Sequence, residues 1–209
     1  MLGQLYERAL TGERCWLRHD DGVVHRLPVR SWLGGHGADT VFDSAVVALC
    51  KGPTIDLGCG PGRLVAQLVQ RGIPALGVDQ SATAIGLARR SGAPALLRDV
   101  FEPLPGTGRW QTVLLADGNV GLAGDPRRIL RRAGEMLRAG GHCVAEFDPV
   151  TDGVQTRWVR LESSHTVGPW FKWASVGVDC AAALAEEVGL ALVGLHPIGQ
   201  RVVATLSLR

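Results

Sequence analysis

The chain has 209 residues, of which 46% are hydrophobic and 20% charged, and its formal net charge is +2. This length suits one domain with a sizeable core, and the composition excludes a disordered chain. The charge argues neither for nor against an acidic partner, and no apolar run reaches the roughly 18 residues of a membrane span.

The first 38 residues predict a helix and a hairpin. Apolar residues recur at helical spacing over residues 1–10. The sequence His19-Asp20-Asp21-Gly22 lies between two apolar runs, and Asp-Gly in this position is typical of a hairpin turn. With His25 these side chains could be mistaken for a metal cluster, but their coincidence with the turn signal favours a solvated turn.

From residue 39 onward, strands and helices alternate as a parallel doubly wound sheet requires. A helix capped by Asp39 or Thr40 comes first, and Ser81 and Asp125 are expected to cap two later helices. The expected strands are 53–57, 73–78, 94–98, 112–116 and 142–147, and the helices between them are 61–71, 81–90 and 125–139. After an extended stretch to about residue 175 we expect a helix over 178–188 and two antiparallel strands, 190–196 and 201–207, joined by a turn at 197–200.

The first strand-to-helix junction carries the glycine-rich turn Asp56-Leu57-Gly58-Cys59-Gly60-Pro61-Gly62. A helix N-terminus offers unpaired N–H groups, and glycines let a ligand approach the backbone closely. A dinucleotide fingerprint needs Gly-x-Gly-x-x-Gly, but position 63 is Arg63, which disfavours a nicotinamide-dependent oxidoreductase. The turn instead resembles motif I of the class I S-adenosylmethionine (SAM)-dependent methyltransferases.

This resemblance covers about residues 40–209. It implies a three-layer α/β fold with a doubly wound, mostly parallel sheet of seven strands in the order 3-2-1-4-5-7-6, with an antiparallel terminal strand. We expect a single methyltransferase domain. Its expected parts are an N-terminal helix and hairpin extension (1–38), a SAM-binding core (39–148), a substrate-side insertion (149–175) and a terminal helix and hairpin (176–209).

Ligands of open parallel sheets bind beyond the carboxyl ends of the strands, so the residues that follow each strand are candidate contacts. Asp79 follows the second strand, where an acidic group can accept both ribose hydroxyls; its alternative role is a helix cap. The resemblance implies that the glycine turn holds the methionyl end of SAM, with Asp56 on the ammonium side. It also implies that Asp99 and Val100 bind the adenine, unless Asp99 is a surface acid, and that residues 117–119 face the sulfonium. The cofactor-binding residues expected in this way are Asp56, Gly58, Cys59, Gly60, Gly62, Asp79, Gln80, Asp99, Val100, Asp117, Gly118 and Asn119.

The segment after the fourth strand is Asp117-Gly118-Asn119, not the Asn/Asp-Pro-Pro-Tyr signature of enzymes that methylate exocyclic or amide nitrogens. Its absence disfavours a DNA adenine or glutamine methylase.

Two groups of residues are candidates for the acceptor side of the reaction. An O- or C-methylating enzyme often adds a base, and the candidate bases, none singled out by spacing, are His165, His36, Asp148 and Tyr6. Aromatic residues gather after the fifth strand, where the family often inserts a substrate-recognition piece. They could wall a planar small molecule, pack in the core or form a dimer contact: Trp158, Trp170, Phe171 and Trp173.

The arginines between 127 and 138 fit the solvated outer face of a sheet-covering helix better than a nucleic-acid site. The five cysteines are scattered without a Cys-x-x-Cys pair, which indicates reduced thiols, no zinc site and a cytoplasmic protein, in agreement with an N-terminus unlike a signal peptide.

We therefore predict a cytoplasmic, SAM-dependent methyltransferase that acts on an O, N, S or C nucleophile of a small molecule. No metal, nucleic acid or membrane partner is expected, and a homodimer is left open. The alternatives are an RNA methyltransferase and a catalytically silent SAM-fold binding module.

Overall fold

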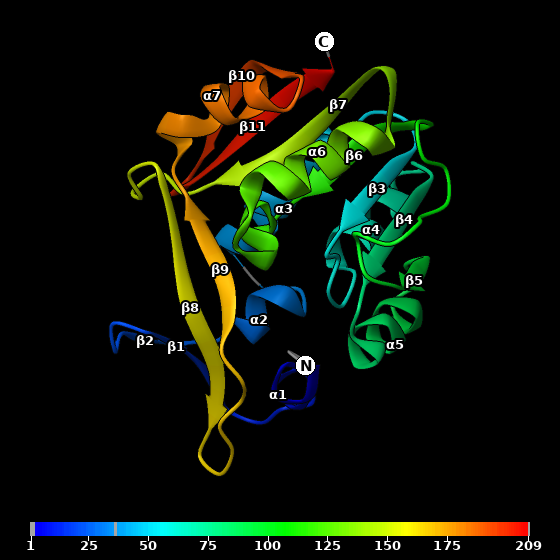
Figure 1. Cartoon of the computed structure of the whole chain (residues 1–209). Helices are drawn as coiled ribbons and strands as arrows, with labels where there is room; N and C mark the ends of the chain where they lie inside the picture. Colours follow the sequence, from blue (N-terminus) through cyan, green and yellow to red (C-terminus); the bar gives the residue numbers. More distant parts are fainter. Residues whose placement is uncertain (1–2, 36, 209) are drawn as a thin grey trace.

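The largest element of the computed structural model, which describes residues 3–35 and 37–208, is a seven-stranded sheet (Figure 1). Its order is β10-β11-β7-β6-β3-β4-β5, which read from β5 is the expected 3-2-1-4-5-7-6. Strands β5, β4, β3, β6 and β7 run parallel, whereas β11 is antiparallel to both β7 and β10. The fold class predicted from the sequence is therefore confirmed. The strands are β3 (Thr54–Leu57), β4 (Ala75–Asp79), β5 (Ala95–Leu97), β6 (Trp110–Leu115), β7 (Leu137–Phe147), β10 (Leu190–Ile198) and β11 (Arg201–Leu208).

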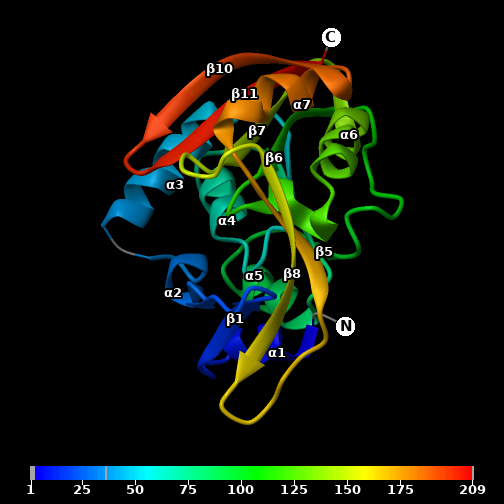
Figure 2. The ribbon, with the colours of Figure 1, turned by 60° about the vertical axis from the view of Figure 1, so that its left-hand side comes forward.

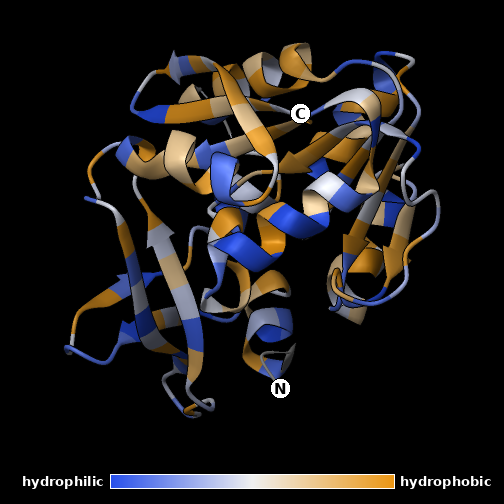
Figure 3. Cartoon of the chain, turned by 45° about the horizontal axis from the view of Figure 1, so that its top comes forward, coloured by the Kyte–Doolittle hydropathy of each residue, from blue (hydrophilic) through white to orange (hydrophobic). Residues whose placement is uncertain are grey.

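Helices cover both faces of this sheet because its strands are apolar on both sides. Leu114 of β6 packs on one face with Phe42 of α3, and its neighbour Val113 packs on the other with Ile129 of α6. Successive side chains of a strand point to opposite faces, so both faces need a cover. Figure 3 shows the hydrophobic colour along these strands. The helices on the first face are α3 (Ala38–Leu49), α4 (Arg63–Gln70) and α5 (Ala82–Arg90), and those on the second are α6 (Pro126–Met136) and α7 (Ala181–Glu187).

Two of the expected helix caps are confirmed. The Ser81 hydroxyl accepts a hydrogen bond from the Ala84 N–H (3.1 Å), and the Asp125 carboxylate accepts one from the Arg128 N–H (3.0 Å). Each side chain satisfies one of the N–H groups that the first turn of a helix leaves free.

The expected cap of α3 is wrong. Gly37 occupies the N-cap position with φ 66°, and no side chain caps the helix. The Asp39 carboxylate accepts a hydrogen bond from the Ser31 hydroxyl (2.9 Å), and the Thr40 hydroxyl donates to the Gly35 carbonyl. Both side chains are thus used by the connection that precedes the helix.

Pairing between strands also places two element boundaries at other residues than the sequence predicts. Helix α6 ends at Met136, not at 139, because Leu137 is extended and pairs with Trp110 of β6. The turn of the terminal hairpin shrinks to residues 199–200, because Pro197 and Ile198 remain paired with β11.

The N-terminal hairpin and the insertion form a second sheet, which the sequence did not predict. Strands β1 (Cys15–His19) and β2 (Val24–Arg26) confirm the expected hairpin, and β1 pairs antiparallel with β8 (Val154–Ser163). Strand β9 (Phe171–Val176) completes the order β2-β1-β8-β9. In Figure 1, β8 and β9 run from the end of β7 down past the carboxyl edge of the large sheet.

Helix α1 (Gly3–Leu10) packs on this second sheet through Leu5 and Ala9, which bury against Cys15 and Leu161. It also contacts α5, as Figure 2 shows. The short helices α2 (Val29–Trp32), η1 (Asn119–Gly124) and η2 (Val178–Cys180) complete the chain. No helix in the described ranges is long and apolar enough to cross a membrane.

Gly62 and Gly72 provide a matched test of the packing between α4 and α5. Both have positive φ (80° and 74°), but a Cβ on Gly62 would lie 2.6 Å from that of Ala88, whereas a Cβ on Gly72 would meet nothing within 4 Å. We expect Gly72→Ala to lower the free energy of unfolding by about 1 kcal/mol through backbone strain. Gly62→Ala should lower it by about 2–4 kcal/mol, because overpacking is added to the strain. Denaturant titration measures both, and equal losses would refute the close packing.

Candidate active site

The glycine turn at the end of β3 has a left-handed backbone that approaches two side chains. Gly58 and Gly60 have φ 85° and 54°. A Cβ on Gly58 would lie 2.6 Å from the Asn119 amide nitrogen, and one on Gly60 would lie 3.0 Å from the Tyr6 hydroxyl. The N–H groups of Gly58 and Cys59 both donate to the Val78 carbonyl of β4, which holds the turn against the neighbouring strand. Glycine is thus required at both positions, because a side chain would be strained and would collide.

Asp56, the last acidic residue before this turn, is 3% exposed, and its carboxyl group has no hydrogen-bond partner within the described ranges. Burial raises its pKa to about 8, and the charge of Asp117 acts in the same direction. No described side-chain oxygen is both fully buried and without a hydrogen bond, so the carboxyl oxygens of Asp56 keep some contact with solvent. Asp56 can therefore form a hydrogen bond with a ligand.

Asp79 connects the glycine turn to the start of α5. Its carboxylate accepts hydrogen bonds from the Gly60 N–H (3.0 Å) and the Ser81 N–H (2.8 Å). An ionised carboxylate has about four acceptor sites, so about two remain for a ligand. The cap of α5 is supplied by Ser81 and not by Asp79.

The remaining predicted contacts on this side follow β4 and β5. Gln80 and Asp99 are exposed, and the Asp99 carboxylate accepts a hydrogen bond from the Phe101 N–H (2.9 Å). Val100 is buried, and its carbonyl accepts a hydrogen bond from Arg132 (2.9 Å). These residues border the same edge of the sheet as Asp79, since β4 and β5 are parallel neighbours.

Asp117 belongs to a chain of charges that we call the carboxylate–arginine network: Asp43, Arg63, Asp117, Arg201 and Glu146. Arg63 binds Asp117 through both terminal nitrogens (2.5 and 3.0 Å) and Asp43 through Nε (3.0 Å). Arg201 bridges Asp117 (2.8 Å) and Glu146 (2.6 Å), and the Asp117 N–H donates to Glu146 (2.6 Å). Burial opposes ionisation of Asp117, but the hydrogen bonds and charges of the two arginines outweigh it and lower the pKa.

The sequence analysis missed three members of this network: Asp43, Glu146 and Arg201. Arg63 was used only as evidence against a dinucleotide site. No local pattern pointed to the network, because its members come from α3, α4, the loop after β6, β7 and β11. Asp117 itself has φ 54°, which is uncommon for a residue other than glycine.

Asn119 joins the loop after β6 to the glycine turn. Its amide nitrogen donates to the carbonyls of Leu57 (3.1 Å) and Gly58 (2.9 Å). Its neighbour Gly118 lines a cavity of about 240 Å³. One short loop thus touches both the turn and the cavity.

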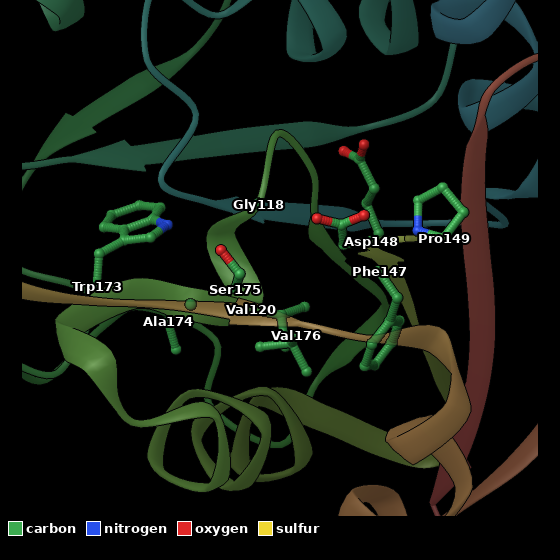
Figure 4. A pocket seen from close by; sticks show the side chains of 11 residues that line it. Gly118, Val120, Phe147, Asp148, Pro149, Trp173, Ala174, Ser175 and Val176 are labelled. Atoms are coloured by element: carbon green, nitrogen blue, oxygen red, sulfur yellow. The ribbon is translucent and has the colours of Figure 1, made fainter. Parts of the chain in front are cut away.

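The cavity is bounded by this loop, by residues 146–149 at the end of β7 and by residues 173–176 of β9. Figure 4 shows Trp173 and Asp148 on opposite sides of it, with the Ser175 hydroxyl between them. Of the three candidate bases that the structure describes, Asp148 is the one that lines the cavity, and of the four aromatic candidates Trp173 is the one that does so. The structure thus brings together one member of each predicted group.

The other aromatic candidates lie elsewhere on the second sheet. Trp158 and Trp170 are exposed by 48% and 41% and stack with the cations of Lys172 and Arg160. Phe171 borders a separate cavity of about 110 Å³ between the second sheet and α1.

The remaining candidate bases differ in their surroundings. His165 lies in the exposed loop that joins β8 to β9, at the other end of these strands from the large cavity, and His36 falls outside the described residues. Tyr6 packs edge-on against Trp32, and burial, aided by the charge of Asp79, raises the pKa of its hydroxyl well above the usual value. At neutral pH Tyr6 is therefore a hydrogen-bond donor beside Gly60.

Within residues 3–35 and 37–208, no group of three or more His, Cys, Asp or Glu side chains could hold a metal ion.

Comparisons with known proteins agree with the fold. The profile of a methyltransferase domain matches residues 55–141. A SAM-dependent methyltransferase from Bacteroides fragilis, solved with S-adenosyl-L-homocysteine (SAH), superposes with a TM-score of 0.80 at 16% identity, over 98% of this chain and 92% of that chain. The 1,6-didemethyltoxoflavin-N1-methyltransferase of Burkholderia thailandensis gives 0.59 at 18% identity, over 78% and 76% of the two chains. A sugar N-methyltransferase from Streptoalloteichus gives 0.59 at 18% identity, over 82% and 86%.

Asp56→Asn should remove a pH-dependent loss of stability. The pKa of Asp56 is about 8 in the folded chain and about 3.9 when unfolded, so its contribution to stability is full below about pH 4 and is lost as the pH rises from about 4 to 8. Without ligand, the free energies of unfolding of the two proteins should run parallel below about pH 4 and again above about pH 8. Between these limits the variant should gain on the wild type by about 1.4 kcal/mol for each pH unit. Denaturant titrations across this range measure the difference, and a difference independent of pH would contradict the assignment.

Arg63→Gln should strongly destabilise the fold, because Asp43 and Asp117 would lose their shared counter-charge in a buried place. We expect a loss of about 3–5 kcal/mol in the free energy of unfolding. Arg127→Gln is the matched control, since Arg127 forms an exposed ion pair with Glu187 and should have little effect. If denaturant titrations give similar losses for the two variants, the carboxylate–arginine network stabilises the fold no more than an exposed ion pair does.

Proposed function

We propose that the chain is a class I SAM-dependent methyltransferase, as the match of a methyltransferase-domain profile to residues 55–141 supports, and that it methylates a small molecule bound in the 240 Å³ cavity. The observation that carries this proposal is the loop of residues 117–119. Asn119 holds the glycine turn by its main-chain carbonyls, while Gly118 lines the cavity. A cofactor on the turn and an acceptor in the cavity would therefore meet at this loop.

The residues present fit SAM. The carboxyl group of Asp56 forms no hydrogen bond within the described residues and suits the ammonium end, and the glycines of the turn let a ligand approach the main chain. Asp79 retains acceptor sites for the ribose hydroxyls, and Asp99 and Val100 lie at the next strand end for the adenine. Bound SAM supplies a methyl group attached to a positively charged sulfur.

The chain's own contribution is alignment and exclusion of water. Alignment of the reacting groups can lower a barrier by roughly 7–11 kcal/mol. Asn119 and the carboxylate–arginine network hold the loop after β6 in one position, and β9 closes the cavity from the second sheet.

Two observations favour a small molecule over RNA. The toxoflavin and sugar enzymes named above act on small molecules, and the cavity, about 240 Å³, has the size of a small-molecule site. Three of the four arginines of α6 contact other parts of the chain: Arg127 pairs with Glu187, Arg128 stacks on Phe101, and Arg132 binds the carbonyls of Val100 and Glu102. RNA affinity that falls steeply with salt would favour the RNA alternative.

The ribose role of Asp79 can be separated from its role in the turn with a ligand pair. Calorimetry should show that wild-type protein binds SAH at least tenfold more tightly than 2′,3′-dideoxy-SAH. Asp79→Asn should bind both ligands with similar, weak affinity, because the carboxylate that accepts hydrogen bonds from the ribose hydroxyls is lost.

Asp152→Asn is the matched control, because Asp152 is exposed and distant in sequence from every predicted cofactor contact. If the wild type and Asp79→Asn prefer SAH over 2′,3′-dideoxy-SAH by the same factor, Asp79 does not bind the ribose hydroxyls. Failure of the wild type to bind either SAM or SAH would overturn the proposed function itself.

A further inference from the structure

The lining of the large cavity has an unusual balance of charge. Its described side chains include two carboxylates, Glu146 and Asp148, the indole of Trp173 and the hydroxyl of Ser175, and none of them is cationic. The other lining groups are glycines and apolar residues. Any ligand therefore meets two carboxylates, a hydroxyl that can donate or accept, and an indole that offers an aromatic ring and one N–H donor.

The two carboxylates are not equivalent. Glu146 accepts hydrogen bonds from Arg201 through Nε and Nη2 (both 2.6 Å), so its charge is matched by a guanidinium. Within residues 3–35 and 37–208, the Asp148 side chain accepts from two neutral donors, the Val150 N–H (2.9 Å) and the Thr151 hydroxyl (2.8 Å), and forms no ion pair. Because a carboxylate has about four acceptor sites, Asp148 has room for about two more donors.

The network beside the cavity does not offset the charge of Asp148. It contains three carboxylates (Asp43, Asp117 and Glu146) against two guanidiniums. With Asp148 the excess is two negative charges next to the proposed methyl-transfer site. This field repels anionic acceptors and attracts cations.

We infer that the acceptor is a small amine, held between the Asp148 carboxylate and the Trp173 indole and methylated on nitrogen. This inference rests on the proposed function and adds the substrate class. An N–H group can donate to the free acceptor sites of Asp148, and an indole face attracts the positive charge of an ammonium. Figure 4 shows the two side chains on either side of the same space.

The charge balance of the reaction selects nitrogen among the possible nucleophiles. An acceptor that enters as an ammonium ion first gives one proton to water, which frees the lone pair of the amine. This lone pair forms the new N–C bond while the S–C bond breaks and its electron pair stays on sulfur. The positive charge thereby moves from sulfur to nitrogen, where Asp148 and Trp173 stabilise it, and the N–H proton then passes to the Asp148 carboxylate or to water. Thiolate, phenolate and enolate acceptors would have to enter this negative field as anions, and a neutral alcohol would need a stronger base to take its proton.

Three probes of nearly the same shape test the inference: benzylamine, benzyl alcohol and benzoate. Protein saturated with SAH is titrated with each probe and followed by NMR, so the readout is binding and not turnover. We expect benzylamine to bind at least tenfold more tightly than benzoate, with benzyl alcohol between them. Asp148→Asn should reduce this preference to less than threefold, and Trp173→Leu should weaken benzylamine more than benzyl alcohol.

Asp152→Asn is the matched control, an equivalent change at an exposed neighbour outside the cavity, and should keep the wild-type preference. SAH affinity, measured on each variant, should stay unchanged. If benzoate binds as well as benzylamine, if none of the probes binds, or if Asp148→Asn leaves the preference intact, the amine inference is wrong. Any of these three outcomes contradicts the amine inference but not the proposed methyltransferase function, provided that the wild type binds SAH. If the wild type does not bind SAH, both the proposed function and the amine inference are wrong.

Discussion

The bidentate ion pair between Arg63 and Asp117 is the contact on which the rest of the site depends. It joins the start of α4, directly after the glycine turn, to the loop after β6. A guanidinium and a carboxylate that are both buried are stable only when their geometry and remaining hydrogen bonds are good. Here Asp43 and Arg201 complete that requirement, so the turn and the loop can hardly move independently.

The same network connects β11 to the loop after β6 and to β7. Arg201, the first residue of β11, reaches Asp117 and Glu146 and stacks on Phe42 of α3 (3.4 Å). The terminal hairpin therefore extends the sheet and also sets the position of a carboxylate that lines the cavity. This explains how a sheet edge far along the chain can influence the site.

The second sheet and the helix packed on it, α1, border the cavity and the glycine turn. Strands β8 and β9 continue from the end of β7, and β1 pairs with β8, which brings α1 and Tyr6 back over the glycine turn. Glu7 of α1 accepts hydrogen bonds from the Ser81 hydroxyl (3.0 Å) and the Thr83 N–H (3.3 Å) at the start of α5. The N-terminal extension and the insertion thus form one structural unit, which approaches the glycine turn through α1 and lines the cavity through β9.

The sequence by itself determined the order of strands and helices, the hairpin at residues 15–27, the caps at Ser81 and Asp125, and the glycine turn after β3. These features depend on hydrophobic period, on turn chemistry and on residues close in sequence, which short segments encode. The tertiary structure alone decided that Asp148 and Trp173 share a cavity, that Trp158 and Trp170 do not, and that Asp117 is bound by two arginines. The pairs that meet are 25 positions apart for Asp148 and Trp173, and up to 84 positions apart for Asp117 and its two arginines. Such pairs meet only after the sheet order and the second sheet have formed, and no local pattern records which partner a buried charge will find.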